Sequence, residues 1–264
     1  MNRIVFYSVL VIAGTAIGSD PGIAVSGNAA SIVAEARYPV AEKPGPIEVV
    51  QLTVDFSPGA WTSVHSHGGQ AINLVLAWDI TLREDGAERS HKAGQGWTDS
   101  TGRFHSAGNT GSGEARLLTT FLLSKGAPQT TVRSEPKLGP TIAREARFDM
   151  DLPSGTEVTQ QAIDLRPGGR IDQFGEGFTG VTVLDGEVAV EIGKSRKPYR
   201  MGESWSARSG ESLAVENAST RNARIFVTRV IPKRSAQRAT TTVVQALSSF
   251  GNSRASAIRT LSRG

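Results

Sequence analysis

The stretch GAWTSVHSH, residues 59–67, carries the pattern from which the fold and the site of this protein can be inferred. His65 and His67 stand two residues apart, so on a β-strand both side chains point to the same face, about 7 Å apart along the chain. Neutral imidazole nitrogens are good ligands for divalent transition metals such as zinc. The pair therefore predicts part of a metal site, whose third ligand must come from a neighbouring strand.

A second stretch, GQGWTDSTGRFHSAGN at residues 94–109, supplies a third histidine, His105. Its glycine-rich turn region allows a later strand to return beside the first. We predict that His65, His67 and His105 bind one metal ion. The alternative is a structural role for these histidines, in which case changing His65 alters stability but no bound metal. The fourth histidine, His91, stands between charged neighbours and is expected to be solvated.

Around these histidines the sequence has the pattern of short strands separated by turns. Residues 47–56 alternate between apolar and polar side chains, and residues 72–82 and 116–123 are rich in Leu, Val and Ile. Turn sequences such as Ser57-Pro58-Gly59 separate these runs. Because residues 45–231 contain no convincing long amphipathic helix, the sequence predicts an all-β fold.

An internal repeat divides this all-β region into two copies of one domain. The offset between matching positions is 109 residues at first and 108 residues after a one-residue gap. The matches include turn glycines and a tryptophan that recurs in both copies, which we attribute to packing rather than to ligand stacking. The matching residues are Gln51 with Gln160, Asp55 with Asp164, Gly59 with Gly168, Gly94 with Gly202, Trp97 with Trp205, Gly102 with Gly210, Asn109 with Asn217 and Arg116 with Arg224.

The two histidine stretches resemble the motifs of the cupin superfamily, and the repeat resembles the two-domain bicupins. The first family motif, a glycine followed after five residues by His-x-His, matches the first stretch, and the second motif matches the second stretch. The matching residues are Gly59, His65 and His67 in the first motif, and Gly94, Gly102, His105 and Asn109 in the second, with Ser100 at the family's proline position. This resemblance implies two tandem jelly-roll β-barrels, with the three histidines as metal ligands inside the first barrel.

The chain departs from the cupin pattern at the usual fourth ligand. The family's glutamate falls at Ala71 or Ile72, so no carboxylate stands at the expected place. We assign the adjacent Gln70 a catalytic role, in which its amide positions water or substrate; a plain pocket or turn role is the alternative. Asn73 shares the strand face of Ala71 and is a further candidate.

The second copy has lost the histidines. His105 aligns with Leu213, which cannot bind a metal. The resemblance therefore implies a degenerate second domain with a structural or ligand-shaping role, and catalysis by Glu176 is a remote alternative. The residues aligned with His65 and His67 are Phe174 and Glu176, or Gln173 and Gly175 if the gap falls earlier.

A metal held by three neutral histidines keeps positions open for water, substrate or dioxygen. Cupins with all-histidine iron sites include dioxygenases, so the resemblance implies oxidation or carbon–carbon cleavage of a small chelating molecule. The expected cofactor is a divalent transition metal, Fe, Mn, Zn, Ni or Cu, with Fe(II) preferred. Isomerases and decarboxylases of the superfamily are rival activities, and a non-catalytic small-ligand-binding or sensor cupin is the alternative from another functional class.

Composition narrows the choice of partners. The chain has 264 residues and no cysteine, which excludes disulfide frameworks, zinc–thiolate sites, iron–sulfur clusters and cysteine nucleophiles. The net charge is +4, but residues 233–264 contain six basic residues and no acidic one, so the rest of the chain carries −2. The basic character therefore belongs to the tail, and we expect a small-molecule ligand or substrate and no nucleic acid.

The sequence predicts five segments. Residues 1–29 are a signal peptide and leader, because an apolar run follows a basic start, with possible cleavage after Ala16, Gly18, Ser26 or Ala29. We therefore expect an exported protein, periplasmic or secreted, without stable membrane insertion after cleavage. The other segments are the N-terminal cupin domain at 30–126, a linker at 127–155, the degenerate C-terminal domain at 156–232 and a basic tail at 233–264, either disordered or a surface-binding helix. Homo-oligomerisation is left open.

Overall fold

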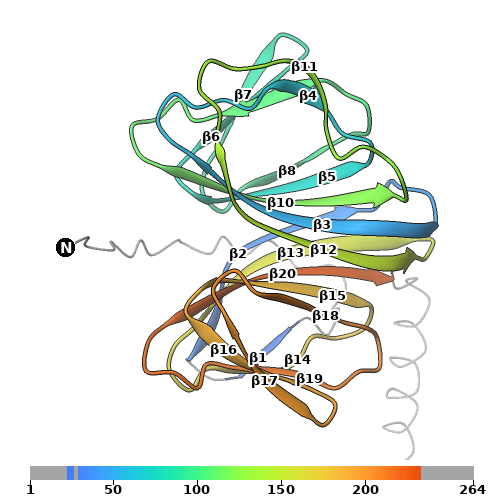
Figure 1. Cartoon of the computed structure of the whole chain (residues 1–264), viewed down its shortest axis with the longest axis vertical. Coiled ribbons are helices and arrows are strands. Elements are labelled where there is room, and N and C mark those ends of the chain that lie inside the picture. Colours follow the sequence, from blue (N-terminus) through green and yellow to red (C-terminus); the bar gives the residue numbers. More distant parts are fainter. Residues whose placement is uncertain (1–22, 27–28, 233–264) are drawn as a thin grey trace, which may run out of the picture.

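The computed structural model describes residues 23–26 and 29–232, and every regular element within them is a β-strand. The strands form four five-stranded sheets, and two sheets build each of two barrels that are stacked along the long axis of the molecule (Figure 1). This confirms the all-β prediction and the two tandem jelly-roll barrels. The proposed signal sequence up to residue 22 and the basic tail from residue 233 lie outside the described residues.

The N-terminal barrel has an inner sheet, which faces the other barrel, and an outer sheet. All neighbouring strands are antiparallel. The inner sheet has the order β12 (Thr141–Leu152), β3 (Gly45–Phe56), β10 (Ala115–Ser124), β5 (Gln70–Ala77) and β8 (Gly96–Asp99). The outer sheet has the order β11 (Thr131–Ser134), β4 (Val64–Ser66), β9 (His105–Gly108), β6 (Ile80–Glu84) and β7 (Ala87–His91).

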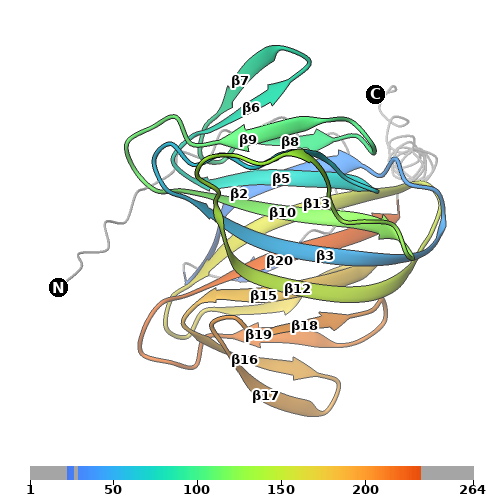
Figure 2. The ribbon, with the colours of Figure 1, turned by 45° about the horizontal axis from the view of Figure 1, so that its top comes forward.

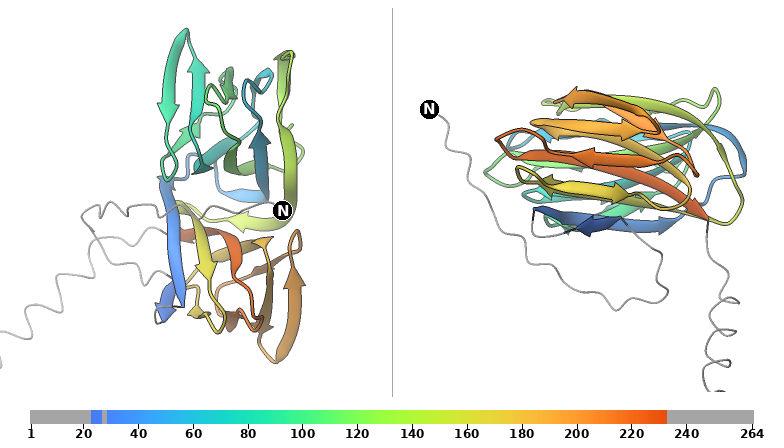
Figure 3. Two further views of the ribbon diagram at one scale, coloured as in Figure 1. Left: turned by 90° about the vertical axis from the view of Figure 1, so that its left-hand side faces the viewer. Right: turned by 90° about the horizontal axis from the view of Figure 1, so that it is seen from below.

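The C-terminal barrel repeats this arrangement, as the end-on and side views in Figure 3 show. Its inner sheet has the order β18 (Ser204–Ala207), β15 (Phe178–Asp185), β20 (Ala223–Pro232), β13 (Thr156–Leu165) and β2 (Ala30–Pro39). Its outer sheet has the order β1 (Ala24–Ser26), β14 (Arg170–Gln173), β19 (Leu213–Glu216), β16 (Glu187–Ile192) and β17 (Ser195–Arg200).

Strand β10 is apolar on both faces because each face packs against a different layer. Leu117, Phe121 and Leu123 belong to the core of the N-terminal barrel. Leu118 and Leu122 belong to the two clusters that pack between the barrels. A strand that is buried on both faces has a nearly continuous apolar sequence rather than an alternating one, which explains the apolar run seen there.

The two barrels exchange strands, so the domain boundaries differ from those expected (Figure 2). β2, expected in the N-terminal domain, pairs with β13 of the C-terminal barrel, whereas β12, expected in the linker, pairs with β3 of the N-terminal barrel. Residues 127–155 also contain β11, which pairs with β4. Without the exchange, β3 and β13 would be exposed sheet edges, and covering such edges removes a row of unpaired backbone groups.

The expected leader at residues 1–29 also extends too far into the fold. Ile23 is buried in the core of the C-terminal barrel, and β1 pairs with β14. Of the four cleavage positions considered, the two later ones would therefore remove a paired strand, and the two earlier ones would keep it.

The two inner sheets meet through buried hydrogen bonds. Corresponding residues of the two barrels make corresponding bonds, so the two barrels are related by a pseudo-twofold axis. Gln51 donates from Nε2 to Thr228 Oγ1 at 2.7 Å, and its repeat partner Gln160 donates from Nε2 to Thr120 Oγ1 at 2.8 Å. Thr120 and Thr228, also repeat partners, are joined by a hydrogen bond of 2.8 Å. The two glutamines recur in the sequence because each satisfies a buried group of the opposite barrel.

The repeated asparagine of the second motif also has a structural role. Asn109 donates from Nδ2 to the carbonyl oxygen of Phe56 at 2.9 Å, and Asn217 donates in the same way to that of Leu165 at 2.8 Å. Both asparagines are fully buried. Since the bond is present in both barrels, this residue belongs to the architecture of each barrel rather than to the metal site.

Candidate metal centre

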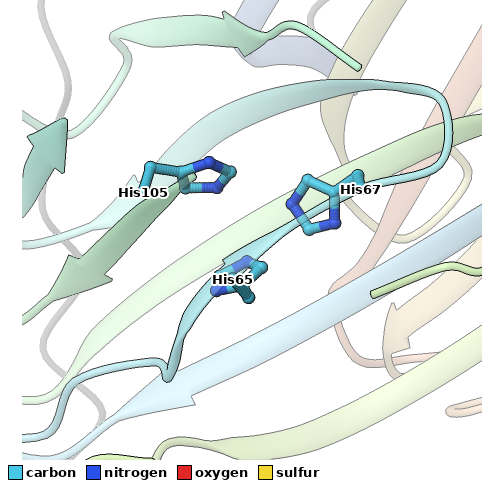
Figure 4. A group of neighbouring side chains, drawn as sticks. All are labelled: His65, His67 and His105. Carbon is cyan, nitrogen blue, oxygen red and sulfur yellow. The ribbon is translucent and has the colours of Figure 1, made fainter. Parts of the chain in front are cut away.

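The three histidines that the sequence singled out meet inside the N-terminal barrel, where their rings point toward one another (Figure 4). His65 on β4 lies directly opposite His105 on β9 in the antiparallel register, and His67 follows the end of β4. The ring centroids are 4.6 to 5.1 Å apart. One ligand nitrogen from each residue lies within 4.8 Å of the other two, so the group can hold a metal ion.

Each ring is oriented by a hydrogen bond to a backbone carbonyl. The Nδ1 atoms of His65, His67 and His105 lie 2.7, 2.9 and 3.1 Å from the carbonyl oxygens of Ser63, Gln129 and Arg103, respectively. A carbonyl oxygen only accepts, so in each pair Nδ1 carries the hydrogen. Nε2 is therefore the ring nitrogen that is free to bind a metal. This is the arrangement by which proteins fix the tautomer and the direction of metal-binding histidines.

All three rings are buried, and burial keeps the imidazoles of His65 and His67 neutral. His65, His67 and His105 are 7%, 5% and 4% exposed. Burial lowers the pKa of His67 to about 3, repulsion from His65 and His105 adds to the effect, and the bond to Gln129 opposes it. Burial also lowers the pKa of His65. Because a metal binds the unprotonated ring, both residues are in the binding form at neutral pH.

We expect the metal-free protein to lose stability as the pH falls from about 6.5 toward 3. An unfolded histidine takes up a proton near pH 6.5, whereas folded His67 stays neutral until about pH 3. The unfolded state therefore binds more protons in this window, and the free energy of unfolding decreases with decreasing pH. In thermal melts, the metal-free wild type should lose stability relative to His67→Gln as the pH falls from about 6.5 to 3, whereas the difference between the two should stay constant above pH 7; parallel curves through the window would contradict the assignment.

A buried carboxylate, Asp99, lies beside the three rings and was missed in the sequence. It stands at the end of β8, is 4% exposed, and places Oδ2 at 3.5 Å from His105 Nε2. Asn73 Nδ2 donates to Oδ2 at 2.7 Å and Trp97 Nε1 donates to Oδ1 at 3.0 Å. Burial raises the pKa of Asp99, while His105 and the two hydrogen bonds act in the opposite direction. A usable signal was its spacing of two from the buried Trp97, which puts both on one strand face.

The expected position of the family's glutamate lies across the sheet from this aspartate. Ala71 and Asp99 are Cα partners in the pairing of β5 with β8. Asn73, the further candidate, occupies the same face as Ala71 and accepts a hydrogen bond from Thr119 Oγ1 at 2.8 Å. A carboxylate is therefore present after all, on the neighbouring strand.

Gln70 does not have the position that the catalytic role requires. Its side chain leaves β5 on the face opposite to Ala71, because successive residues of a strand alternate between faces. Its Oε1 accepts from the backbone N–H of Ala41 at 2.8 Å, and its Nε2 donates to Pro39 O at 3.0 Å and to Thr98 Oγ1 at 3.1 Å. The amide thus fastens the β2–β3 connection to the inner sheet, and the catalytic assignment is corrected to a structural one.

The remaining residues considered from the sequence lie away from the three rings. His91 is partly buried rather than fully solvated, and its ring packs on Trp97 at 4.5 Å between centroids. In the C-terminal barrel, Phe174 and Leu213 fill the apolar core where histidines would stand, and Glu176 is exposed. Among the described residues, the metal-type cluster is confined to the N-terminal barrel.

An open hollow of about 500 Å³ lies against the outer sheet and includes His105 in its lining. Phe104 and Arg133 also line it, and the guanidinium of Arg133 stacks on the Phe104 ring at 3.6 Å. Arg133 comes from β11, and Gln129, which orients His67, comes just before that strand. The segment expected to be a linker therefore builds part of the site and its surroundings.

Comparisons with known proteins show the fold. No family model matches the sequence, and no curated protein matches it. The vicilin of Solanum melongena is similar with a TM-score of 0.53 and 12% identity, covering 76% of this chain and 82% of that chain. The vicilin of Solanum lycopersicum is similar with a TM-score of 0.51, with the same identity and coverage. These neighbours are cupin proteins, and this chain accordingly has the two-barrel cupin fold of the bicupins.

Proposed function

We propose that this protein is a metal-dependent oxidoreductase of the dioxygenase type, acting on a small molecule that chelates the metal. The observation that carries the proposal is the convergence of three buried imidazoles, from each of which one ring nitrogen lies within 4.8 Å of the other two. Such donors suit Fe, Mn, Zn, Ni or Cu, and Fe(II) is the ion we prefer. A bound divalent ion would supply Lewis acidity and open positions for substrate and dioxygen.

The chain's own residues fit such an ion and define what the protein contributes. Backbone carbonyls orient the three rings before any ligand arrives, so little reorganisation is needed on binding. Phe121 packs on His67 at 4.7 Å between ring centroids, and the apolar core of the N-terminal barrel surrounds the site. These apolar neighbours lower the local dielectric constant, which strengthens electrostatic interactions within the site.

A non-catalytic small-ligand-binding cupin is the second candidate. It is favoured by the engagement of the Gln70 amide with the backbone, which removes the expected substrate-positioning group. The vicilin of Solanum melongena is described as holding different anionic ligands in structurally similar pockets, and binding without chemistry is a known use of a shared fold.

Oxygen uptake separates the two candidates. Protein stripped of metal and reloaded with Fe(II) under anaerobic conditions would be mixed with aerated buffer and a panel of small molecules that carry two neighbouring oxygen donors. The enzyme proposal expects oxygen consumption that needs both the ion and one of these molecules. Binding of a panel molecule without oxygen consumption supports the second candidate instead.

We also propose that the protein is exported, because residues 1–18 have the pattern of a signal sequence. The described part of the chain contains no helix long and apolar enough to cross a membrane. N-terminal sequencing of the mature protein from cells checks this, and the pairing of β1 with β14 leads us to expect cleavage before Ile23.

A further inference from the structure

The position of Asp99 points to a ligand role that the cupin resemblance does not assign. We propose that Asp99 supplies a carboxylate oxygen as a ligand to the metal held by His65, His67 and His105. Two nitrogens then come from the outer sheet, one from the residue that follows β4, and the oxygen comes from the inner sheet. This inference rests on the proposed metal binding by the three histidines.

Asp99 faces the ring nitrogen of His105 that is free to bind a metal. His105 Nδ1 donates to the carbonyl of Arg103, so Nε2 is the free nitrogen of the ring, and it lies 3.5 Å from Asp99 Oδ2. Two ligand atoms bound at about 2.0–2.2 Å to one tetrahedral ion are separated by about 3.4 Å. The observed spacing of 3.5 Å between His105 Nε2 and Asp99 Oδ2 matches that of two ligands of the same ion.

The direction of the Asp99 carboxyl group is fixed by two hydrogen-bond donors. Asn73 donates to Oδ2 and Trp97 donates to Oδ1, so each carboxylate oxygen accepts one hydrogen bond. Thr119 in turn fixes Asn73 through the amide oxygen. Carboxylates that bind metals are themselves hydrogen-bonded in this way, and each oxygen keeps a further lone pair for a cation.

The second barrel, which lacks the histidines, also lacks the carboxylate of Asp99. The strand pairing of Asn73 with Trp97 is repeated there by Val181 with Trp205. At the offset of 108, Asp99 corresponds to Ala207, and Thr119 corresponds to Val227. The C-terminal barrel thus keeps the tryptophan. It has apolar residues at the three positions that correspond to Asn73, Asp99 and Thr119.

The indole nitrogen of Trp205 lacks the carboxylate acceptor that Trp97 has. Trp205 Nε1 is buried without a hydrogen-bond partner, whereas Trp97 Nε1 donates to Asp99. If the carboxylate served packing, it would be expected in both barrels like the tryptophan. Instead it accompanies the histidines, as a ligand of the same ion would.

The cross-strand position of Ala71 allows a rescue experiment. Ala71 and Asp99 are direct partners on the interior face, with side chains that start about 5 Å apart. A glutamate at position 71 in an Asp99→Ala background therefore returns a carboxylate to the same space from the other strand. A hydrogen-bonding role toward Trp97 and Asn73 would not be restored in this way, because it depends on the place of Asp99 itself.

The experiment titrates Co(II) into metal-free wild type, Asp99→Asn, Asp99→Ala and the double variant Ala71→Glu/Asp99→Ala, with circular dichroism as a check on folding. We expect both single variants to weaken Co(II) binding by about 10- to 100-fold or more, taking the cost of losing an outer partner as the lower limit. Their visible absorption should also change, because an oxygen ligand is lost. The double variant should regain at least tenfold in affinity. Asp149→Ala, an exposed carboxylate bound to Lys125, is the matched control and should equal the wild type.

The outcomes separate this inference from the proposed function. Wild-type protein that binds no Co(II) contradicts the three-histidine site itself. Tight wild-type binding with unchanged affinity and spectrum in folded Asp99→Asn leaves that site standing and overturns the role of Asp99. Failure of the folded double variant to regain affinity also overturns it. An infrared difference spectrum of the wild type on adding Zn(II) needs no variant: a shifted carboxylate band supports the proposal, and an unshifted one overturns it.

Discussion

Replacing His67 with alanine should abolish stoichiometric metal binding while both barrels stay folded. The wild type is expected to bind one ion per chain, since the described residues contain one three-histidine group. His67 is one of its three nitrogen donors, and its replacement removes a ligand outright. Loss of an outer partner alone typically costs 10- to 100-fold in metal affinity, so we expect a loss of more than about 100-fold here. Metal analysis after dialysis and direct titration measure the change.

The matched control for this variant is His91→Ala. His91 is the fourth histidine of the chain, and it packs on Trp97 outside the three-ring cluster. It should retain one ion per chain. Equal metal content in His67→Ala and the wild type would remove the basis of the proposed function and leave a paired β-scaffold.

Replacing Gly69 with alanine should both destabilise the protein and weaken metal binding. A Cβ atom at this position would lie 2.0 Å from the carbonyl oxygen of Leu122 and 2.9 Å from its carbonyl carbon. Both are backbone atoms of β10, which cannot turn aside as a flexible side chain does. Forcing extra volume into a packed site costs about 1–3 kcal/mol, and we expect the upper end, about 3 kcal/mol. Urea unfolding measures this loss.

The metal binding is affected because Gly69 lies in the turn that follows His67. The neighbouring Gly68 donates its N–H to Pro128 O at 2.9 Å, so the turn is held on two sides and relief of the clash must move it. Gly111→Ala is the control, because an added Cβ there meets only the Asn109 side chain, at 3.3 Å. Gly111→Ala should stay within about 0.5 kcal/mol of the wild type. Similar losses in the two variants would contradict the close-packing argument.

Gln70 and Asn73, the two polar candidates on β5, show how far the strand pattern of a sequence predicts which residues reach a site. Gln70 is adjacent to Ala71 in sequence, but adjacency in a strand means opposite faces, so Gln70 binds the β2–β3 connection. Asn73 shares the face of Ala71 and does point to the site, where it contacts Asp99. The two-residue period of a β-strand is enough to rank Asn73 above Gln70 as a residue of the site. Proximity along the chain, which favoured Gln70, was the wrong criterion.

The prediction of the domain boundaries was wrong for a different reason. A segment rich in Pro, Thr and Arg between two repeats has the composition of a linker, yet β12 within it has a polar, half-exposed sequence because it is an edge strand of the inner sheet. Its partner β3 lies about 90 residues earlier in the chain, in the first copy of the repeat. No local pattern reports which distant edge such a strand will cover.

From the sequence alone we inferred the all-β class, the two copies and the three histidines, because each depends on local periodicity or on fixed spacing along the chain. The approach of Asp99 to His105, the carbonyl of Gln129 that orients His67 and the exchange of β2 with β12 depend on the tertiary structure. These contacts join strands far apart in sequence, and their register is set by the packing of both barrels together rather than by the residues of any one strand.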